Sequence, residues 1–210
     1  MTAYHPAGTP AGPSPYDMYR IFYMFGFAFV CFFVLPMLVV VRILKESPSN
    51  YGLRVPTNYS VLKFAVFCQV LIAALLYFIY SHHSDQRAIF PYSKYLVQSH
   101  SVKVFAFYSA CYFLYYIGWE FFFRGFIQLG TETAVGVPVS ILVQVIPSAI
   151  IHLGNPVSMP KTVEETSSAV IMGVIWGVMT WRTRSILIPF VMHYGTGVMF
   201  DGFITFSSAN

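Results

Sequence analysis

The chain has 210 residues, of which 57% are hydrophobic and only 10% are charged, whereas about 25% of the residues of a soluble domain are charged. Its mean hydropathy is +0.64, and apolar runs long enough to cross a bilayer recur along it, so a membrane protein is predicted. The 12 basic residues lie mostly between the apolar runs and form no stripe that could follow a phosphate backbone. This excludes nucleic acid as a partner.

Residues 1–17 are rich in Pro, Gly and Ala without periodicity, so we expect a flexible tail outside the membrane. About six apolar segments follow and predict an all-α polytopic fold, one transmembrane helical domain over residues 18–205. Their predicted ranges are Met18 to Leu44, Leu62 to Ser81, Val102 to Leu129, Gly136 to His152, Ser168 to Trp181 and Ile186 to Ile204. The fourth and fifth are short for a full span, so we expect them to be tilted, broken or shielded by protein.

A few ionisable side chains lie inside these apolar segments, where a charge at the helix centre costs about 2.5 to 3.5 kcal/mol. They are Glu120, Arg124, His152, His193 and Asp201. Glu120 and Arg124 are four residues apart, so they share a helix face and can form a charge-assisted bond. Two interpretations stay open: a buried ion pair that fixes helix register, or an arginine that orients Glu120 as a general base on water.

The two histidines follow prolines in their segments. His152 comes five residues after Pro147 and directly before a Gly-Asn-Pro stretch, so we expect it at a helix end that lines protein or water. The alternative is an interfacial histidine bonded to the backbone. His193 and Asp201 are eight residues apart, about 12 Å along a helix, so they cannot bond directly within one straight helix. Asp201 is therefore expected near the membrane interface rather than in a site.

The order of these residues is an ExxxR helix, then a His at a helix end, then a last helix with a His after Pro. This order resembles the CPBP family, also called the Abi family, of intramembrane glutamic endopeptidases, which includes the type II CAAX prenyl endopeptidases. The motifs that carry it are WEFFFRGF, HLGNP followed by VEET, GVIWG and RTRSILIPFVMH, and they are similar to a bacterial branch with a Trp before the motif glutamate. The resemblance covers residues 102–203, about half of the chain, as a CPBP-like catalytic core.

The resemblance implies a multi-pass protein of the bacterial plasma membrane, with its helices around a water-accessible intramembrane cavity. It implies an endopeptidase, a hydrolase of the CAAX protease type, that cleaves a peptide or membrane-protein substrate by intramembrane proteolysis. Glu120 matches the motif glutamate and Arg124 its arginine. His152 matches the histidine that activates water together with the glutamate, and His193 matches the donor to the oxyanion.

No cofactor and no metal are expected. A zinc protease is the natural competitor, because one Glu and two His could ligate a metal. The sequence has no HExxH motif and no pair of such ligands on adjacent helical turns, which disfavours metal dependence.

The sequence departs from the family pattern at three positions. Trp119 stands where the family often has the first of two consecutive glutamates, Ser148 where it often has Phe, and Gly197 where it often has Asn or Asp. Glu120 would then serve alone as the base, within hydrogen-bond distance of His152. The alternative is a catalytically silent CPBP-fold membrane protein that acts in binding or self-immunity. A small transporter would instead carry a polar path through both leaflets.

Two further motifs carry structural predictions. Gly173 and Gly177 form a GxxxG pattern, which allows close contact between helices. Glu164 and Glu165 precede an apolar segment, so we expect favourable negative charge at a helix N-terminus, or an acidic pair at the mouth of the cavity.

Overall fold

The computed structural model describes residues 15–56, 59–82, 93–153 and 159–207, and all regular structure in these ranges is helical, which confirms the predicted all-α fold. The elements are α1 (Pro15–Phe29), η1 (Val30–Val34), α2 (Leu35–Leu38), η2 (Val39–Leu44), η3 (Pro48–Tyr51), α3 (Tyr59–His82), α5 (Lys94–Ser99), α6 (Val102–Glu120), η4 (Phe121–Leu129), α7 (Gly130–Val135), α8 (Val137–Leu153), α9 (Met159–Thr183) and α10 (Leu187–Ser207).

Each of the predicted apolar segments is helical, and the differences lie at the ends. The first helix begins at Pro15, inside the predicted tail, and residues 1–14 of that tail lie outside the described residues. Helix α9 begins at Met159, so Glu165 lies inside the helix and not before it. The short elements η3, α5 and α7 were not predicted, because they carry too few residues for an apolar period to show.

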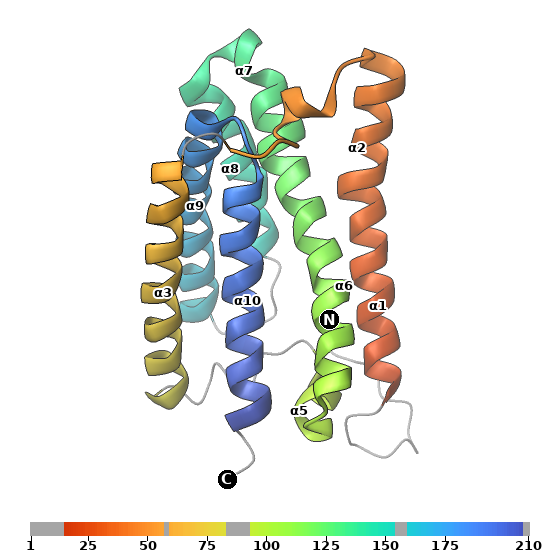
Figure 1. Cartoon of the computed structure of the whole chain (residues 1–210), viewed down its shortest axis with the longest axis vertical. Helices are drawn as coiled ribbons and strands as arrows, with labels where there is room; N and C mark the ends of the chain where they lie inside the picture. The colour runs from red at the N-terminus through yellow and green to blue at the C-terminus, as the bar shows by residue number, and fades with distance from the viewer. Residues whose placement is uncertain (1–14, 57–58, 83–92, 154–158, 208–210) are drawn as a thin grey trace.

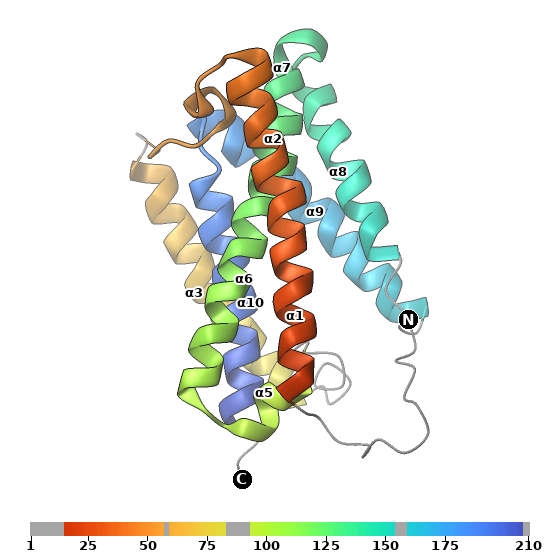
Figure 2. The same ribbon diagram turned by 90° about the vertical axis from the view of Figure 1, so that its right-hand side faces the viewer.

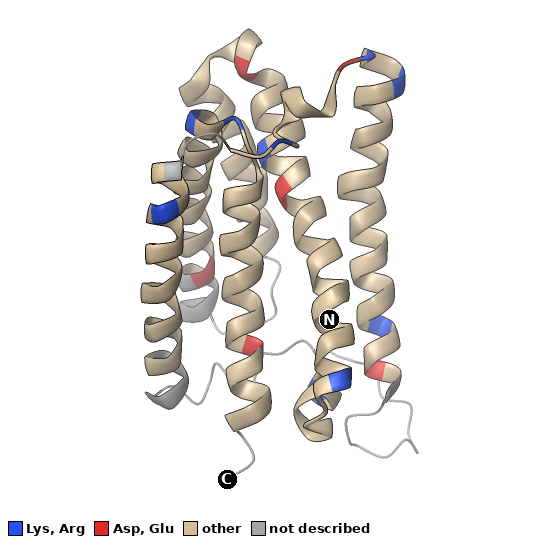
Figure 3. Ribbon diagram, in the orientation of Figure 1, with Lys and Arg blue, Asp and Glu red and all other residues tan. Residues whose placement is uncertain are grey.

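The axes of the long helices lie roughly along the long axis of the molecule (Figure 1). Helix α10 packs against both α3 and α6, and α1 covers the other side of α6. Helices α8 and α9 pack on each other and splay away from α1 at one end (Figures 1 and 2). Lys and Arg gather toward the ends of the helices (Figure 3). The functional candidates therefore lie among α6, η4, α8, α9 and α10.

The lateral surface of this bundle is strongly apolar. Tyr16–Leu44 and Leu187–Ser207 are long and apolar enough to cross a membrane. Large apolar side chains such as Phe27 on α1, Phe64 on α3 and Ile146 on α8 are 72%, 59% and 57% exposed. Water-soluble monomers rarely leave contiguous apolar surface of this extent uncovered. This surface fits contact with lipid.

The GxxxG motif brings α9 close to α8 and η4, as predicted. A Cβ atom at Gly173 would lie 3.1 Å from Val145, and one at Gly177 would lie 3.1 Å from the Gln144 amide nitrogen. The close approach is used by two buried glutamines. Gln144 donates to the Gly173 carbonyl at 3.0 Å, and Gln128 donates to the Gly177 carbonyl at 2.8 Å. Each bond gives a buried amide the hydrogen-bond partner that water supplies at the surface.

The connection after η2 packs directly on η4. The Ile186 amide, just before α10, donates to the Gly52 carbonyl at 3.0 Å. A Cβ atom at Gly125 would lie 2.5 Å from the Tyr51 carbonyl oxygen. Only glycine allows the backbone of η3 to lie this close to η4. Gly125 follows Arg124, so this contact fixes the turn of η4 that carries the candidate arginine.

We therefore expect Gly125→Ala to destabilise the protein by about 1 to 3 kcal/mol, because the added methyl group would force η3 away from η4. The control is Gly26→Ala in α1, where a Cβ atom would meet no other atom within 4 Å. Because Ala favours the helix more than Gly does, Gly26→Ala should raise the free energy of unfolding by about 0.5 to 1 kcal/mol. Thermal unfolding in detergent micelles measures both. Equal Tm values for the two variants would contradict the tight contact.

Candidate active site

Glu120 is the last residue of α6, and its side chain is fully buried. The helix continues from Phe121 as the π-helix η4, a geometry that often occurs at functional sites. Glu120 Oε1 accepts a hydrogen bond from His193 Nδ1 at 2.7 Å and another from Arg124 Nη1 at 3.3 Å. Bonds between charged groups are usually about 2.7 to 2.9 Å long. The histidine is therefore the closer partner of the carboxylate.

Arg124 completes the pair from within the same helical run. It lies four residues after Glu120, and its side chain is only 2% exposed. The predicted contact between the two residues is therefore present. Because a buried carboxylate needs a compensating charge, the guanidinium lowers the cost of placing Glu120 in the interior.

Aromatic rings enclose the imidazole of His193. The ring of Trp176 on α9 lies 4.6 Å from it, and the ring of Tyr116 on α6 lies 4.2 Å from it, centroid to centroid. Trp176 also lies 5.5 Å from Arg124 Cζ, within cation–π range. We call Glu120, Arg124, His193 and Trp176 the Glu120 cluster. It joins α6, η4, α9 and α10.

Three polar atoms of the Glu120 cluster retain unused hydrogen-bonding capacity. Glu120 Oε2, Arg124 Nε and Trp176 Nε1 are buried, and none has a hydrogen-bond partner among the described residues. Most buried polar atoms in proteins are paired, so each exception calls for an explanation. The cluster thus offers one acceptor and two donors to a small polar ligand.

His152 lies at the end of α8, as predicted, but it does not bond to Glu120. Its Nδ1 donates to the Ser148 carbonyl at 2.8 Å, and its ring stands edge-on to Trp119 at 6.2 Å. No hydrogen bond joins Glu120 and His152 in the described structure, so that expectation was wrong. Helix α8 runs through Pro147 without ending there.

The hydrogen bonds of the two histidines determine which nitrogen is free. A carbonyl or an ionised carboxylate only accepts, so Nδ1 of His152 and Nδ1 of His193 each carry a proton. In a neutral imidazole the other nitrogen, Nε2, is then an acceptor. Both histidines therefore present a basic nitrogen, and either would become a donor at Nε2 only as an imidazolium.

The three departures from the family pattern each have a structural counterpart. Trp119 is 5% exposed and packs on Phe123 and on His152. Ser148 supplies the carbonyl that holds His152. At Gly197 a Cβ atom would lie 2.9 Å from the ring of Tyr112. A larger residue at this position therefore requires the tyrosine to move.

Asp201 does not belong to the cluster. It is 1% exposed, and its Oδ2 accepts a hydrogen bond from the Tyr108 hydroxyl at 2.7 Å. The expectation that Asp201 lies near the membrane interface stays a prediction, and the Tyr108 hydroxyl covers its carboxyl group. The separation from His193 along α10 is as expected. Asp201 links α10 to α6 in the part of the bundle away from Glu120.

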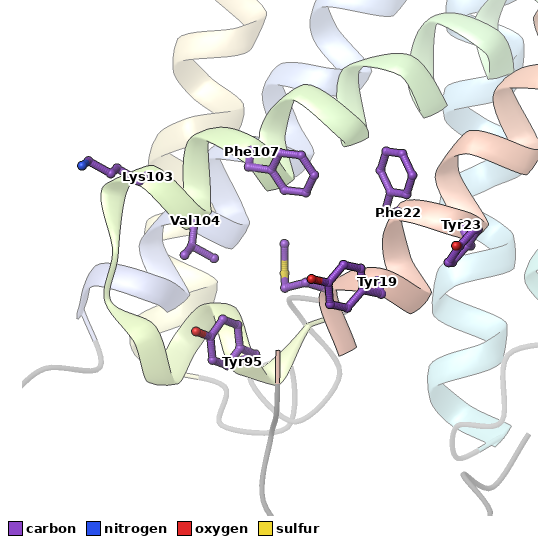
Figure 4. A pocket seen from close by; sticks show the side chains of 8 residues that line it. Tyr19, Phe22, Tyr23, Tyr95, Lys103, Val104 and Phe107 are labelled. Carbon is purple, nitrogen blue, oxygen red and sulfur yellow. The ribbon is translucent and has the colours of Figure 1, made fainter. Parts of the chain in front are cut away.

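A separate groove opens between the N-terminal ends of α1 and α6 and the short helix α5 (Figure 4). It has a volume of about 640 Å³ and is lined by Met18, Tyr19, Phe22, Tyr23, Tyr95, Lys103, Val104 and Phe107. Phe107 precedes Glu120 on α6 by more than three turns, about 20 Å of helix. The groove is therefore distinct from the Glu120 cluster.

The described residues include no group of three or more His, Cys, Asp or Glu side chains that could hold a metal ion. The Glu120 cluster itself contains a carboxylate, a guanidinium, one imidazole and an indole.

Comparison with known proteins adds the family. The model of the type II CAAX prenyl endopeptidase Rce1-like family matches residues 101–199. Over these residues the chain is similar to the Rce1-like family. No curated protein and no solved structure matches the chain. The Rce1-like segment contains α6, η4, α8 and α9 and much of α10, and so contains the whole Glu120 cluster and His152. The resemblance seen in the sequence is confirmed, and with it a membrane protease family.

The sequence signalled three members of this site, because Glu, Arg and His are conspicuous in apolar segments. It did not signal Trp176, since a Trp in an apolar helix looks like an ordinary core residue. The available signal was its place in the GVIWG motif, next to the glycine that brings α9 close to η4.

We expect Arg124→Met to destabilise the protein by about 3 to 5 kcal/mol, because it leaves the buried Glu120 carboxylate without its compensating charge. The matched control is Arg184→Met. Arg184 pairs with Glu132 at 2.6 Å, but its side chain is 42% exposed. Loss of such a surface pair should cost about 0.2 to 1 kcal/mol. Thermal or denaturant unfolding in detergent compares the two, and similar losses would contradict a buried charged pair.

Proposed function

We propose that the chain is an intramembrane endopeptidase that hydrolyses peptide bonds with a water molecule activated by Glu120 and His152. The observation that carries this proposal is that the two oxygens of the Glu120 carboxylate have different surroundings. One oxygen is held by His193 and Arg124, whereas the other is buried and has no partner among the described residues. A carboxylate fixed in this way has an oxygen that can take a proton from water.

The reaction proceeds in two steps. In the first, the water oxygen attacks the carbonyl carbon of the peptide bond, Glu120 Oε2 takes one water proton, and the carbonyl π electrons move to the oxygen. In the second, the tetrahedral intermediate collapses, the C–N bond breaks, and Glu120 returns the proton to the departing nitrogen. The products are a carboxylic acid and an amine, and the enzyme returns to its initial state.

His152 assists the first step through Nε2. Its Nδ1 proton is bound to the Ser148 carbonyl, so Nε2 is an acceptor that can bind a proton of the attacking water. Trp119 packs against the ring and limits its rotation. His152 thus orients the water molecule, and Glu120 takes the proton from it.

His193 and Arg124 hold the Glu120 carboxylate in one orientation. His193 donates to the oxyanion only when it is an imidazolium, because its Nδ1 proton is already bound to Glu120. Arg124 stabilises the ionised form of Glu120 by its charge. Each residue thus favours a carboxylate whose free oxygen remains available.

The proposed setting is a multi-pass protein of the bacterial plasma membrane in which about six helices span the bilayer. The long helices α1–η2 and α10 supply two of these spans, and the exposed apolar faces of α3 and α8 supply others. The substrate is a peptide or membrane protein that reaches the site from the bilayer or its surface. Prenylated and unprenylated peptides are both included among the test substrates.

We expect purified, detergent-solubilised protein to cleave members of a mixed peptide library. Glu120→Gln and His152→Ala should each lower kcat/KM by about 10² to 10⁴-fold, the usual contribution of a group in general acid–base catalysis. The measurement is cleavage followed by mass spectrometry.

Glu132→Gln is the matched control, since Glu132 pairs with Arg184 outside the Glu120 cluster. Its activity should equal that of the unsubstituted protein, and a chelator should leave all rates unchanged. Equal background cleavage in every folded variant would contradict proteolysis and favour a silent member that acts in binding.

A further inference from the structure

The indole of Trp176 lies in the Glu120 cluster but makes no hydrogen bond within the described structure. Its ring packs on His193 at 4.6 Å and on Arg124 Cζ at 5.5 Å. The residue is 6% exposed, and its Nε1 is buried with no hydrogen-bond partner among the described residues. A buried N–H without a partner loses its bond to water and gains none in return, which costs stability. In this structure the unpaired N–H belongs to the same cluster as Glu120, the candidate base.

We propose that Trp176 is a catalytic residue whose Nε1–H donates a hydrogen bond to the carbonyl oxygen of the substrate as that oxygen becomes an oxyanion. This inference rests on the proposed peptide hydrolysis. In the first step of that reaction the carbonyl π electrons move to oxygen, and a donor fixed before the reaction stabilises the charge that forms there. An indole donates only, so its N–H does not compete with the base for protons.

Two hydroxyls in this part of the bundle have hydrogen-bond partners. The Tyr116 hydroxyl is 2.8 Å from the Tyr112 hydroxyl. The Ser148 hydroxyl donates to the Val145 carbonyl at 2.9 Å. Neutral His193 presents an acceptor at Nε2, as argued above. Arg124 Nε is also unused, but its guanidinium already balances Glu120.

The packing of α9 places this indole. Gly177 follows Trp176 and permits α9 to approach η4, and its carbonyl accepts the bond from Gln128 at 2.8 Å. The contact fixes α9 one residue from Trp176, which keeps the ring in place without a hydrogen bond of its own. The indole is therefore positioned before any substrate binds.

The first test is kinetic. Trp176→Phe keeps an aromatic ring against His193 but removes the N–H. We expect kcat to fall by about 10² to 10³-fold, the usual effect of losing one oxyanion donor, while KM stays the same. Trp181→Phe is the matched control, because Trp181 lies on the same helix and is 37% exposed. Its kcat should be unchanged.

The second test needs no turnover. The chain contains three Trp residues, so the full-length protein labelled with ¹⁵N in its indoles gives three N–H signals in micelles, assigned by the Phe variants. The probe is an acetylated apolar tetrapeptide in which a phosphinate, a tetrahedral anionic group, replaces the central amide. We expect the phosphinate to move the Trp176 signal downfield and the matching amide peptide to move it less.

The outcomes separate this proposal from the proposed function. Cleavage with full activity in Trp176→Phe overturns the donor role and leaves proteolysis intact. A phosphinate shift at Trp176 without any cleavage shows that the indole binds an anion, but it overturns the protease and with it the catalytic role of Trp176. Loss of kcat in Trp176→Phe without a shift at Trp176 overturns direct donation and leaves a structural effect. Neither cleavage nor shift overturns both.

Discussion

The burial of one carboxylate constrains the rest of this structure. Glu120 is fully inaccessible in a strongly apolar bundle, and an isolated carboxylate in such surroundings is too costly to keep ionised. It is retained because two partners converge on one of its oxygens. Arg124 comes from the same helical run, whereas His193 comes from α10, far along the chain. The bond from His193 joins α10 to α6, so the position of α10 depends on the carboxylate of Glu120.

Small residues allow the helices to approach closely enough for these bonds. Gly125 admits the backbone of η3 beside the arginine, and Gly177 admits two glutamine side chains beside Trp176. In lipid there is no hydrophobic force that drives helices together, so close backbone contact and buried hydrogen bonds supply the association. The same contacts place the side chains of the Glu120 cluster. Packing and site therefore depend on the same few positions, and enlarging one of these glycines should alter both.

Sequence reasoning succeeded where a feature is local. Apolar runs predict helices because length and hydropathy suffice, and the Glu120–Arg124 contact follows from spacing on one helix. It failed where the partner is distant. The bond from His193 to Glu120 depends on how α10 docks, and the expected bond from His152 to Glu120 is absent, because Nδ1 bonds within α8 and Trp119 packs against the ring. Position 176 gave no chemical signal, since its role depends on an N–H that the fold leaves unpaired.

Charge balance gives a physical account of Trp119. One carboxylate and one guanidinium leave the Glu120 cluster with no net charge, so His193 can stay neutral and keep an acceptor at Nε2. A second carboxylate at position 119 would add a buried negative charge, which protonation of a nearby histidine would have to compensate. An imidazolium has no acceptor nitrogen, so one of the two basic sites would be lost. With an indole at position 119 and a single glutamate, both histidines keep a basic Nε2. The indole also restrains His152 by packing against its ring.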